Sequence, residues 1–288
     1  VSMAFESYAL YPHLTVRENI LHPLKIRGGY TESQMQSLLE EVSTMLRITP
    51  LMDRKTSQLS GGQRQRVGLA RALIREKPNL LLLDEPIAHL DASLRHWLRA
   101  ELKKHIKAKG ITTIYATPDY LEALAMGDRV LVLSQGHLKQ MGSPDDVLYN
   151  PSSAEVAAVI GDPPANVLEA RVVSYEGKFV IDLQGNKIRA PERYQSILGS
   201  KKYDKIIMGI KPSDITILKQ RGDNSIEAKV YVTEPLQRKK VVTLQVGDVQ
   251  VKVNAPLSLD VDIEDQVYAN IDTEKIMLFD PETREAVI

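Results

Sequence analysis

The chain has 288 residues, a length that fits roughly two domains. Its 37 basic and 37 acidic residues give a formal net charge of zero, which argues against a strongly basic nucleic-acid binder, a polybasic membrane-surface protein and an acidic disordered tail. The sequence is 43% hydrophobic and has no cysteine, so it can bury a core but has no disulfide framework, thiolate metal site or cysteine nucleophile.

Helices alternate with short apolar strands in the first half of the chain. Thr31 and Gln34 form a capping box that opens a helix, Ser60 caps a second helix, and a third helix ends at Gly110. The apolar runs between them are typical of strands buried on both faces of a parallel sheet, and each is far shorter than the ~20 residues of a membrane span. This alternation predicts an α/β fold for residues 1–160. The strands are expected at Asn79–Leu83, Ile111–Ala116 and Arg129–Leu133.

Residues 161–166, rich in Gly and Pro, are expected to link two domains. Over residues 167–288, short runs of β-forming residues are separated by Gly, Pro, Asn and Asp. Many short strands at even spacing favour a small all-β, OB-like barrel or sandwich. The strands are expected at Leu168–Val173, Phe179–Leu183, Ile206–Ile210, Ile215–Leu218, Ala228–Val232, Val241–Val246, Val249–Val253 and Val267–Ile271.

The segment Leu59-Ser60-Gly61-Gly62-Gln63 is the most informative in the chain. A serine and two glycines at a helix start expose backbone N–H groups at the positive end of the helix dipole, where a phosphate can approach closely. A bare Ser-Gly-Gly is also compatible with an ordinary capped helix. The longer string and the residues that follow favour the phosphate site.

An acidic pair follows the apolar run Leu80–Leu83, in the order Asp84-Glu85-Pro86. Two carboxylates at the end of a buried strand are costly unless they meet a cation or take part in proton chemistry. We expect Asp84 to hold Mg²⁺, directly or through water, and Glu85 to polarise an attacking water. The alternative is a pair of acids at an exposed strand end.

Together these motifs resemble the nucleotide-binding subunits of ABC transporters. Leu59–Gln63 is similar to the family signature, Leu80–Glu85 to the Walker B strand, and Ala88–Asp91 to the D-loop. The resemblance implies a partial P-loop ATPase domain with a helical signature subdomain, followed by an OB-like TOBE domain. The ATPases of maltose- and glycerol-phosphate-type sugar importers are the most similar subgroup, on the segments Ser7–Val16, Leu121–Arg129, Gly209–Asp214 and Leu278–Thr283.

This resemblance implies ATP and Mg²⁺ as ligands, a second ATPase subunit and transmembrane permease subunits as partners, and a peripheral place on the cytoplasmic face of the membrane. In the family, two subunits sandwich two ATP molecules, each between the phosphate loop of one chain and the signature of the other. The expected contacts to a partner's ATP are therefore Ser60, Gly61, Gly62, Gln63 and Asp91. The expected permease-docking residues are Tyr8, Leu10, Tyr11, Leu14 and Val16.

Nucleic acid is not an expected partner. Arg64, Arg66 and Arg71 lie on the predicted signature helix, but the zero net charge and the absence of interleaved aromatic residues favour a solvated helix face.

Three features depart from the family pattern. No phosphate loop of the form G-x-x-x-x-G-K-[ST] occurs in the 288 residues, and the chain opens on an apolar segment at Val1, so we expect it to start in mid-domain. Glu6 occupies the position of the Q-loop glutamine; it keeps an oxygen for the metal, adds a negative charge and loses an N–H donor. Pro118 replaces the switch histidine, and proline has neither a side-chain donor nor a backbone N–H.

Several interpretations stay open. The leading one is an ATP-binding subunit that powers uptake of a sugar-type solute, with weak or no hydrolysis by this chain alone. A first alternative is a non-catalytic partner that donates the signature in a heterodimer, although the intact Glu85 counts against it. A second is a regulatory protein that acts through residues 167–288. A fragment of a longer gene product explains the missing phosphate loop equally well, but does not explain Pro118.

Overall fold

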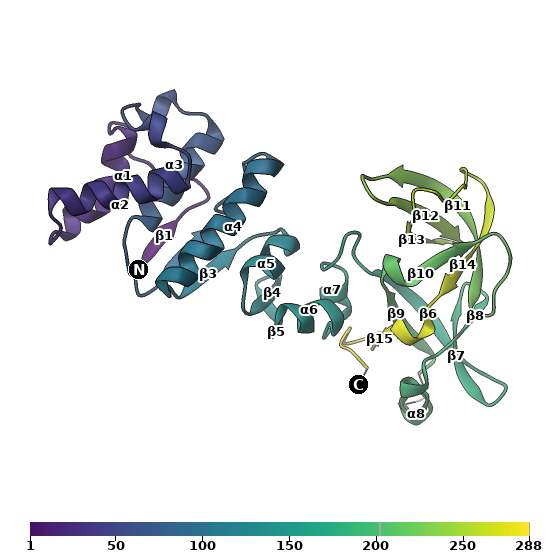
Figure 1. The fold of residues 1–288 in the computed structure, drawn as a ribbon. Coiled ribbons are helices and arrows are strands. Elements are labelled where there is room, and N and C mark those ends of the chain that lie inside the picture. The colour runs from purple at the N-terminus through teal and green to yellow at the C-terminus, as the bar shows by residue number, and fades with distance from the viewer. Residues whose placement is uncertain (202, 288) are drawn as a thin grey trace. The chain divides into compact units, whose positions relative to one another are not determined.

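The computed structural model describes residues 1–201 and 203–287, and the chain divides into two compact units, Val1–Gly127 and Asp128–Ile288. Helices surround a small sheet in the first unit, and strands dominate the second (Figure 1). The division falls before residues 161–166, where the linker is expected. The reason is that α7 (Ala154–Ala157) packs within the second unit, where its alanines share a buried cluster with Ile207 and Phe279.

The first unit is built on a three-stranded parallel sheet in the order β1-β2-β3. The strands are β1 (Ser2–Ala4), β2 (Leu81–Asp84) and β3 (Thr113–Ala116). The helices are α1 (Val16–Arg27), α2 (Glu32–Met45), α3 (Gly61–Leu73), α4 (Ala92–Lys109) and α5 (Tyr120–Met126), with the 3₁₀ turns η1 (Thr49–Leu51) and η2 (Thr56–Gln58). This arrangement confirms the α/β prediction, but the strand expected at Arg129–Leu133 is not part of the parallel sheet. It lies in the second unit, where it pairs antiparallel with His137–Gly142 and leaves Leu131 and Leu133 exposed.

Helices of the first unit begin and end at the capping residues that the sequence predicts. At the start of α2, the Gln34 amide donates to Thr31 Oγ1 at 3.3 Å, and the Thr31 amide donates to Gln34 Oε1 at 2.8 Å. Gly110 ends α4 in the left-handed conformation, with φ +60°. Apolar side chains from α1 to α4 and from β2 form one buried core, so the parallel sheet is held mainly by helix packing.

The second unit contains two five-stranded antiparallel sheets, in the orders β10-β14-β11-β12-β13 and β15-β9-β6-β7-β8, and a separate hairpin β4-β5. Its helices are α6 (Pro144–Tyr149), α7 and α8 (Glu192–Lys201), with the 3₁₀ turns η3 (Pro212–Asp214) and η4 (Thr273–Lys275). Its strands are β4 (Val130–Ser134), β5 (His137–Gly142), β6 (Asn166–Tyr175), β7 (Lys178–Leu183), β8 (Asn186–Arg189), β9 (Lys205–Ile210), β10 (Ile215–Leu218), β11 (Ser225–Pro235), β12 (Lys240–Val246), β13 (Val249–Ala255), β14 (Gln266–Ile271) and β15 (Met277–Phe279).

Both five-stranded sheets bury their apolar faces in one shared core, which includes Met208 from β9 and Leu244 from β12. The side chain of Asn166 joins the sheets, because its Nδ2 donates to the Lys252 carbonyl at 2.9 Å and its Oδ1 accepts from the Lys252 amide at 2.7 Å. All eight strands expected beyond residue 166 are confirmed. Among the described residues, no helix has the length and apolarity to cross a bilayer.

Candidate nucleotide-binding site

Three loops with predicted site residues leave the same edge of the parallel sheet in the first unit. Glu6 follows β1, Glu85 follows β2, and Pro118 follows β3. The register pairs Ala4 with Leu83 and Asp84 with Ala116, so the carboxyl ends of the strands are level. Ligands of open α/β sheets bind at this edge. The fold thus gathers the expected metal, catalytic and switch positions.

Asp84 and Glu85 are half-buried, and neither carboxylate has a hydrogen bond or ion pair with a described residue. Such carboxylates suit Mg²⁺, which takes one or two of them and completes its shell with water and phosphate oxygens. Within residues 1–201 and 203–287, no group of three or more acidic or histidine side chains forms a complete metal cage. The donor set therefore fits a magnesium ion shared with a nucleotide. Glu6 is exposed at the same sheet edge.

The backbone of Glu85 is in the left-handed region, with φ +43°. This conformation is unfavourable for a residue with a Cβ, and such strain is concentrated at functional sites. Three hydrogen bonds hold it: the Glu85 amide donates to the Ala116 carbonyl at 2.9 Å, and the Glu85 carbonyl accepts from Gln65 Nε2 at 2.8 Å and from the Ala88 amide at 3.4 Å. The turn that carries the expected catalytic carboxylate is thus fixed from both sides.

The signature turn lies at the surface. Ser60 is exposed and caps α3, with the Gln63 amide donating to Ser60 Oγ at 3.3 Å and the Ser60 amide donating to Gln63 Oε1 at 2.9 Å. This capping box uses two of the amides that the sequence suggested would be free. The amides of Gly61 and Gly62 have no acceptor among the described residues. Two N–H groups therefore remain for an external anion.

The two glycines of the turn have different surroundings. A Cβ on Gly61 would have no heavy atom within 4 Å, so that position faces open space. A Cβ on Gly62 would lie 3.1 Å from Leu90 Cδ2 and 3.2 Å from the His89 carbonyl oxygen. Packing of the D-loop within this chain therefore explains Gly62 but not Gly61.

Gln65 was missed by the sequence analysis. It is 3% exposed, its Nε2 donates to the Glu85 carbonyl at 2.8 Å, and its Oε1 accepts from the His89 amide at 3.1 Å. The available signal was its spacing, because Gln65 shares an i, i+3, i+4, i+7 face with buried Gly68, Leu69 and Ala72. A glutamine on a buried helix face needs polar partners.

In the D-loop, Asp91 is exposed and caps α4, with the Leu94 amide donating to its Oδ1 at 3.0 Å. Two residues earlier, His89 Nδ1 lies 3.4 Å from Tyr8 Oη, and the two rings meet edge to face. The D-loop thus contacts α3 on one side and the predicted docking segment on the other.

The switch loop is held by a buried carboxylate. Glu122 is 2% exposed and accepts hydrogen bonds from Tyr115 Oη at 2.9 Å and Thr117 Oγ1 at 3.1 Å. Burial, reinforced by Glu122, raises the pKa of Tyr115 far above its usual range. Pro118 is exposed in the bend between β3 and α5 and has no donor to offer a ligand.

The predicted docking segment runs over the surface of α3. Arg71 Nη1 donates to the Ala9 carbonyl at 2.7 Å, and Nη2 donates to the Tyr8 carbonyl at 3.2 Å. Tyr11 is 39% exposed. Among the other expected docking residues, Tyr8, Leu10 and Leu14 are half-buried.

Two expectations for this region are wrong. Val16 is 0% exposed, because it begins the apolar face of α1 and packs in the core, so it does not lie on a docking surface. Arg64, Arg66 and Arg71 are not simply a solvated face, since each guanidinium binds backbone carbonyls. The acceptors are Leu59 for Arg64, Leu46 and Arg47 for Arg66, and Tyr8 and Ala9 for Arg71.

Known proteins with similar sequences establish the family. The ABC transporter family matches residues 1–88, and the TOBE domain matches residues 221–278. The trehalose/maltose import ATP-binding protein MalK of Thermococcus litoralis is 40% identical over 295 residues, which cover 100% of this chain and 78% of that protein. The chain belongs to the ATP-binding proteins of ABC transporters.

Two further members of this ABC transporter family align over nearly the whole chain. The sulfoquinovosyl glycerol transport protein SmoE of Agrobacterium fabrum is 37% identical, covering 100% of this chain and 78% of that protein. The sn-glycerol-3-phosphate import protein UgpC 1 of Rhizobium johnstonii is 34% identical, covering 98% of this chain and 74% of that protein. These relatives confirm the resemblance to sugar-importer ATPases, and the TOBE match confirms the OB-like domain.

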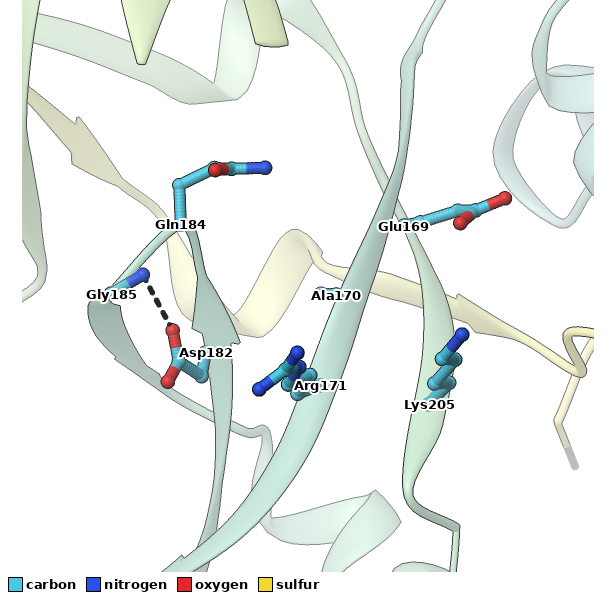
Figure 2. A pocket seen from close by; sticks show the side chains of 7 residues that line it. All are labelled: Glu169, Ala170, Arg171, Asp182, Gln184, Gly185 and Lys205. Carbon is cyan, nitrogen blue, oxygen red and sulfur yellow. Dashed lines mark hydrogen bonds between the residues drawn. The ribbon is translucent and has the colours of Figure 1, made fainter. Parts of the chain in front are cut away.

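A hollow of about 520 Å³ lies on the second unit of this ABC protein, and two acidic and two basic side chains are among the residues that line it. Figure 2 shows Arg171 beside Asp182, which accepts from the Gly185 amide at 2.8 Å. Arg171 pairs in register with Asp182 on one side and with Lys205 on the other, whereas Glu169 pairs with Ile207. An opposite-charge pair across two strands is stabilising and a like-charge pair is destabilising, so this lining of two acidic and two basic side chains points to no ligand of one charge.

Proposed function

We propose that this chain is the ATP-binding subunit of an ABC importer for a sugar-type solute. It acts with a second ATP-binding subunit, peripheral to the cytoplasmic face of the membrane, and presents its signature turn to ATP held by that subunit. The import roles in the names of MalK, SmoE and UgpC support a sugar-type solute.

The open N-terminus of α3 carries this proposal. Ser60 is exposed, and the amides of Gly61 and Gly62 have no acceptor among the described residues. The space around Gly61 is open. A 13-residue helix directs the positive end of its dipole at this space, which suits the terminal phosphate of a nucleotide. The Gln63 side-chain amide, which has no acceptor among the described residues, would add a donor to the phosphate, and the Asp91 carboxylate would line the edge of the contact without binding phosphate oxygens, because like charges repel.

The acidic sheet edge supports a second role for the chain. Asp84 would hold Mg²⁺, and Glu85 would polarise a water for attack on the terminal phosphate. When bound, the metal would neutralise negative charge on the phosphates. Glu6 would add an oxygen ligand, but its charge opposes the phosphates unless the metal offsets it.

Hydrolysis at this chain's own sheet edge is expected to be weak. Pro118 has no donor for the terminal phosphate, and hydrogen bonds of Glu122 to the residues before Pro118 hold its loop. The chain therefore contributes most through the signature turn. Tyr8, Leu10, Tyr11 and Leu14 would transmit the state of this assembly to a permease helix, on a segment held in place by Arg71.

The test is ATP hydrolysis by this chain alone and in a mixture with an ATP-binding subunit that carries a phosphate loop. We expect stimulation only in the mixture, and its loss in Ser60→Arg, because a long cation would fill the space in front of α3. Ser57→Arg is the matched control, since Ser57 is exposed in η2 three residues before the turn. Robust turnover by the chain alone, or an unchanged rate in Ser60→Arg, contradicts the proposal.

A further inference from the structure

A single buried side-chain amide connects the signature helix to both functional loops beside it. Gln65 projects from the first turns of α3 and binds the Glu85 carbonyl and the His89 amide at 2.8 and 3.1 Å. One N–H of its amide nitrogen and its amide oxygen are both engaged, and the residue is 3% exposed, so water competes little for either bond.

We propose that Gln65 is a positioning residue that makes the signature turn, the backbone of the catalytic carboxylate and the D-loop one mechanical unit. This inference rests on the proposed function, since it assigns to Gln65 the alignment of groups that act on nucleotide. Gln65 itself does not touch a nucleotide, because its amide is buried behind the turn and engaged by this chain.

The residues on either side explain why this link matters. Glu85 is in a strained left-handed conformation, and the bond from Gln65, at 2.8 Å, is the shortest of the three hydrogen bonds that hold its backbone and the one that comes from a side chain. The D-loop lies against α3 at Gly62, where a Cβ would come within 3.2 Å of the His89 carbonyl oxygen and force a neighbour to shift. A displacement of α3 on meeting a partner's nucleotide is thus passed to Glu85 through Gln65 and to His89 through both Gln65 and Gly62.

The contact also reaches the predicted docking segment. His89 Nδ1 lies 3.4 Å from Tyr8 Oη, and Arg71 on the same helix holds the Tyr8 carbonyl at 3.2 Å. Tyr8 and His89 are therefore both attached to α3, so the helix joins the surface expected to meet the permease with the surface expected to meet the nucleotide. Gln65 is the part of this connection that is shielded from solvent.

Two substitutions separate the two bonds of Gln65. Gln65→Met keeps the length and loses both bonds, whereas Gln65→Glu keeps an acceptor for the His89 amide and loses the donor to the Glu85 carbonyl. Arg64→Met is the matched control, because Arg64 binds only the Leu59 carbonyl at its own end of the helix. Thermal unfolding of each variant establishes that it is folded.

The first readout is hydrogen–deuterium exchange of the His89 amide in the full chain. We expect exchange in Gln65→Met to be about 10-fold faster or more, with Gln65→Glu and Arg64→Met close to the unsubstituted chain. Unchanged exchange in Gln65→Met would show that the link does not hold the D-loop, and would overturn the proposal.

The second readout is steady-state ATP hydrolysis in the mixture with a phosphate-loop-bearing subunit. Gln65→Met should lower kcat about 10-fold and leave KM for ATP within about twofold, because misalignment impairs turnover more than binding. Faster exchange with an unchanged kcat overturns the positioning role. If the unsubstituted chain gives no stimulation, the proposed function alone is contradicted, and the exchange data decide whether Gln65 holds the D-loop.

Discussion

Arg71 on α3 donates to the Ala9 carbonyl at 2.7 Å, and this bond fixes a segment whose backbone is otherwise unfavourable. Tyr8 and Ala9 both have positive φ, +65° and +44°. A Cβ on Gly68 would lie 3.2 Å from the Tyr8 carbonyl oxygen, so the segment and the helix are in close contact. The planar guanidinium meets two successive carbonyls and so adds to the backbone bonds of this strained turn, in which the Tyr8 amide donates to the Phe5 carbonyl at 3.0 Å and the Ala9 amide to the Ser7 carbonyl at 2.8 Å.

Arg71→Lys should loosen this segment although it keeps the positive charge. A lysine ammonium lacks the fork that reaches two carbonyls at once. We expect a loss of about 1–2 kcal/mol in unfolding free energy and faster proteolysis between Tyr8 and Tyr11. Arg75→Lys serves as the control, since Arg75 binds the Val1 carbonyl elsewhere. Equal cleavage rates at the segment in both variants would contradict this assignment.

The glycines of the signature turn predict opposite outcomes for the same substitution. Gly61→Ala should leave stability unchanged or raise it by about 0.5 kcal/mol, because the site is open and alanine favours helix. Gly62→Ala should cost about 1–3 kcal/mol, since the new methyl meets Leu90 and the His89 carbonyl. Denaturant unfolding followed by fluorescence of Trp97, the single tryptophan, measures both. Equal losses of unfolding free energy in Gly61→Ala and Gly62→Ala would contradict the packing of the D-loop against Gly62.

Pro118→His should not restore hydrolysis to the chain by itself. A switch donor is useful only if a phosphate loop holds the nucleotide at the same sheet edge. In a fusion that adds a phosphate-loop segment from another family member, we expect Pro118→His to raise phosphate release about 10²-fold, as for one well-placed transition-state donor. Equal rates in the fusions with and without the Pro118→His substitution would show that another group replaces the switch.

His105 predicts an acid-side loss of stability. Burial, with Lys109 adding to it and Glu41 opposing it, lowers the pKa of His105 below its ordinary value of 6.5. The unfolded chain therefore takes up the proton first, and the stability contributed by the neutral ring is lost as pH falls from about 6.5 toward the folded pKa. Unfolding midpoints between pH 5 and 8 should fall less steeply in His105→Phe than in the unsubstituted chain. Parallel curves would assign the acid sensitivity to other groups.

Much of the fold follows from local patterns. The Thr31 capping box, the Ser60 cap, the stop at Gly110 and the β-rich runs after residue 166 are read from neighbouring residues, and all are confirmed. The helix at Val16–Arg27 was not predicted, although Thr15 and Glu18 form a capping box of the same kind. Its apolar positions are interrupted by Pro23 and by buried Asn19, which weakens the periodic signal.

Site residues that lie together in one short motif could be predicted from the sequence. Those that come together only through folding could not. Ser60 to Gln63 and the Asp84–Glu85 pair each lie within one short string. Gln65 acts on residues 20 and 24 positions further along, so its role depends on how α3 packs against the end of β2. Val16 was misassigned for the same reason, because burial of a helix's first residue is decided by tertiary packing.

The left-handed backbone of Glu85 lowers the stability of the folded protein at the same residue whose side chain is proposed to act in hydrolysis. Glycine would relieve a conformational penalty of about 1 kcal/mol there, so Glu85→Gly should make a more stable protein without the carboxylate that we propose to activate water. Laboratory evolution for heat tolerance would therefore tend to discard this carboxylate, whereas Glu85→Gln, which keeps the strain, is the fairer inactive reference for hydrolysis measurements.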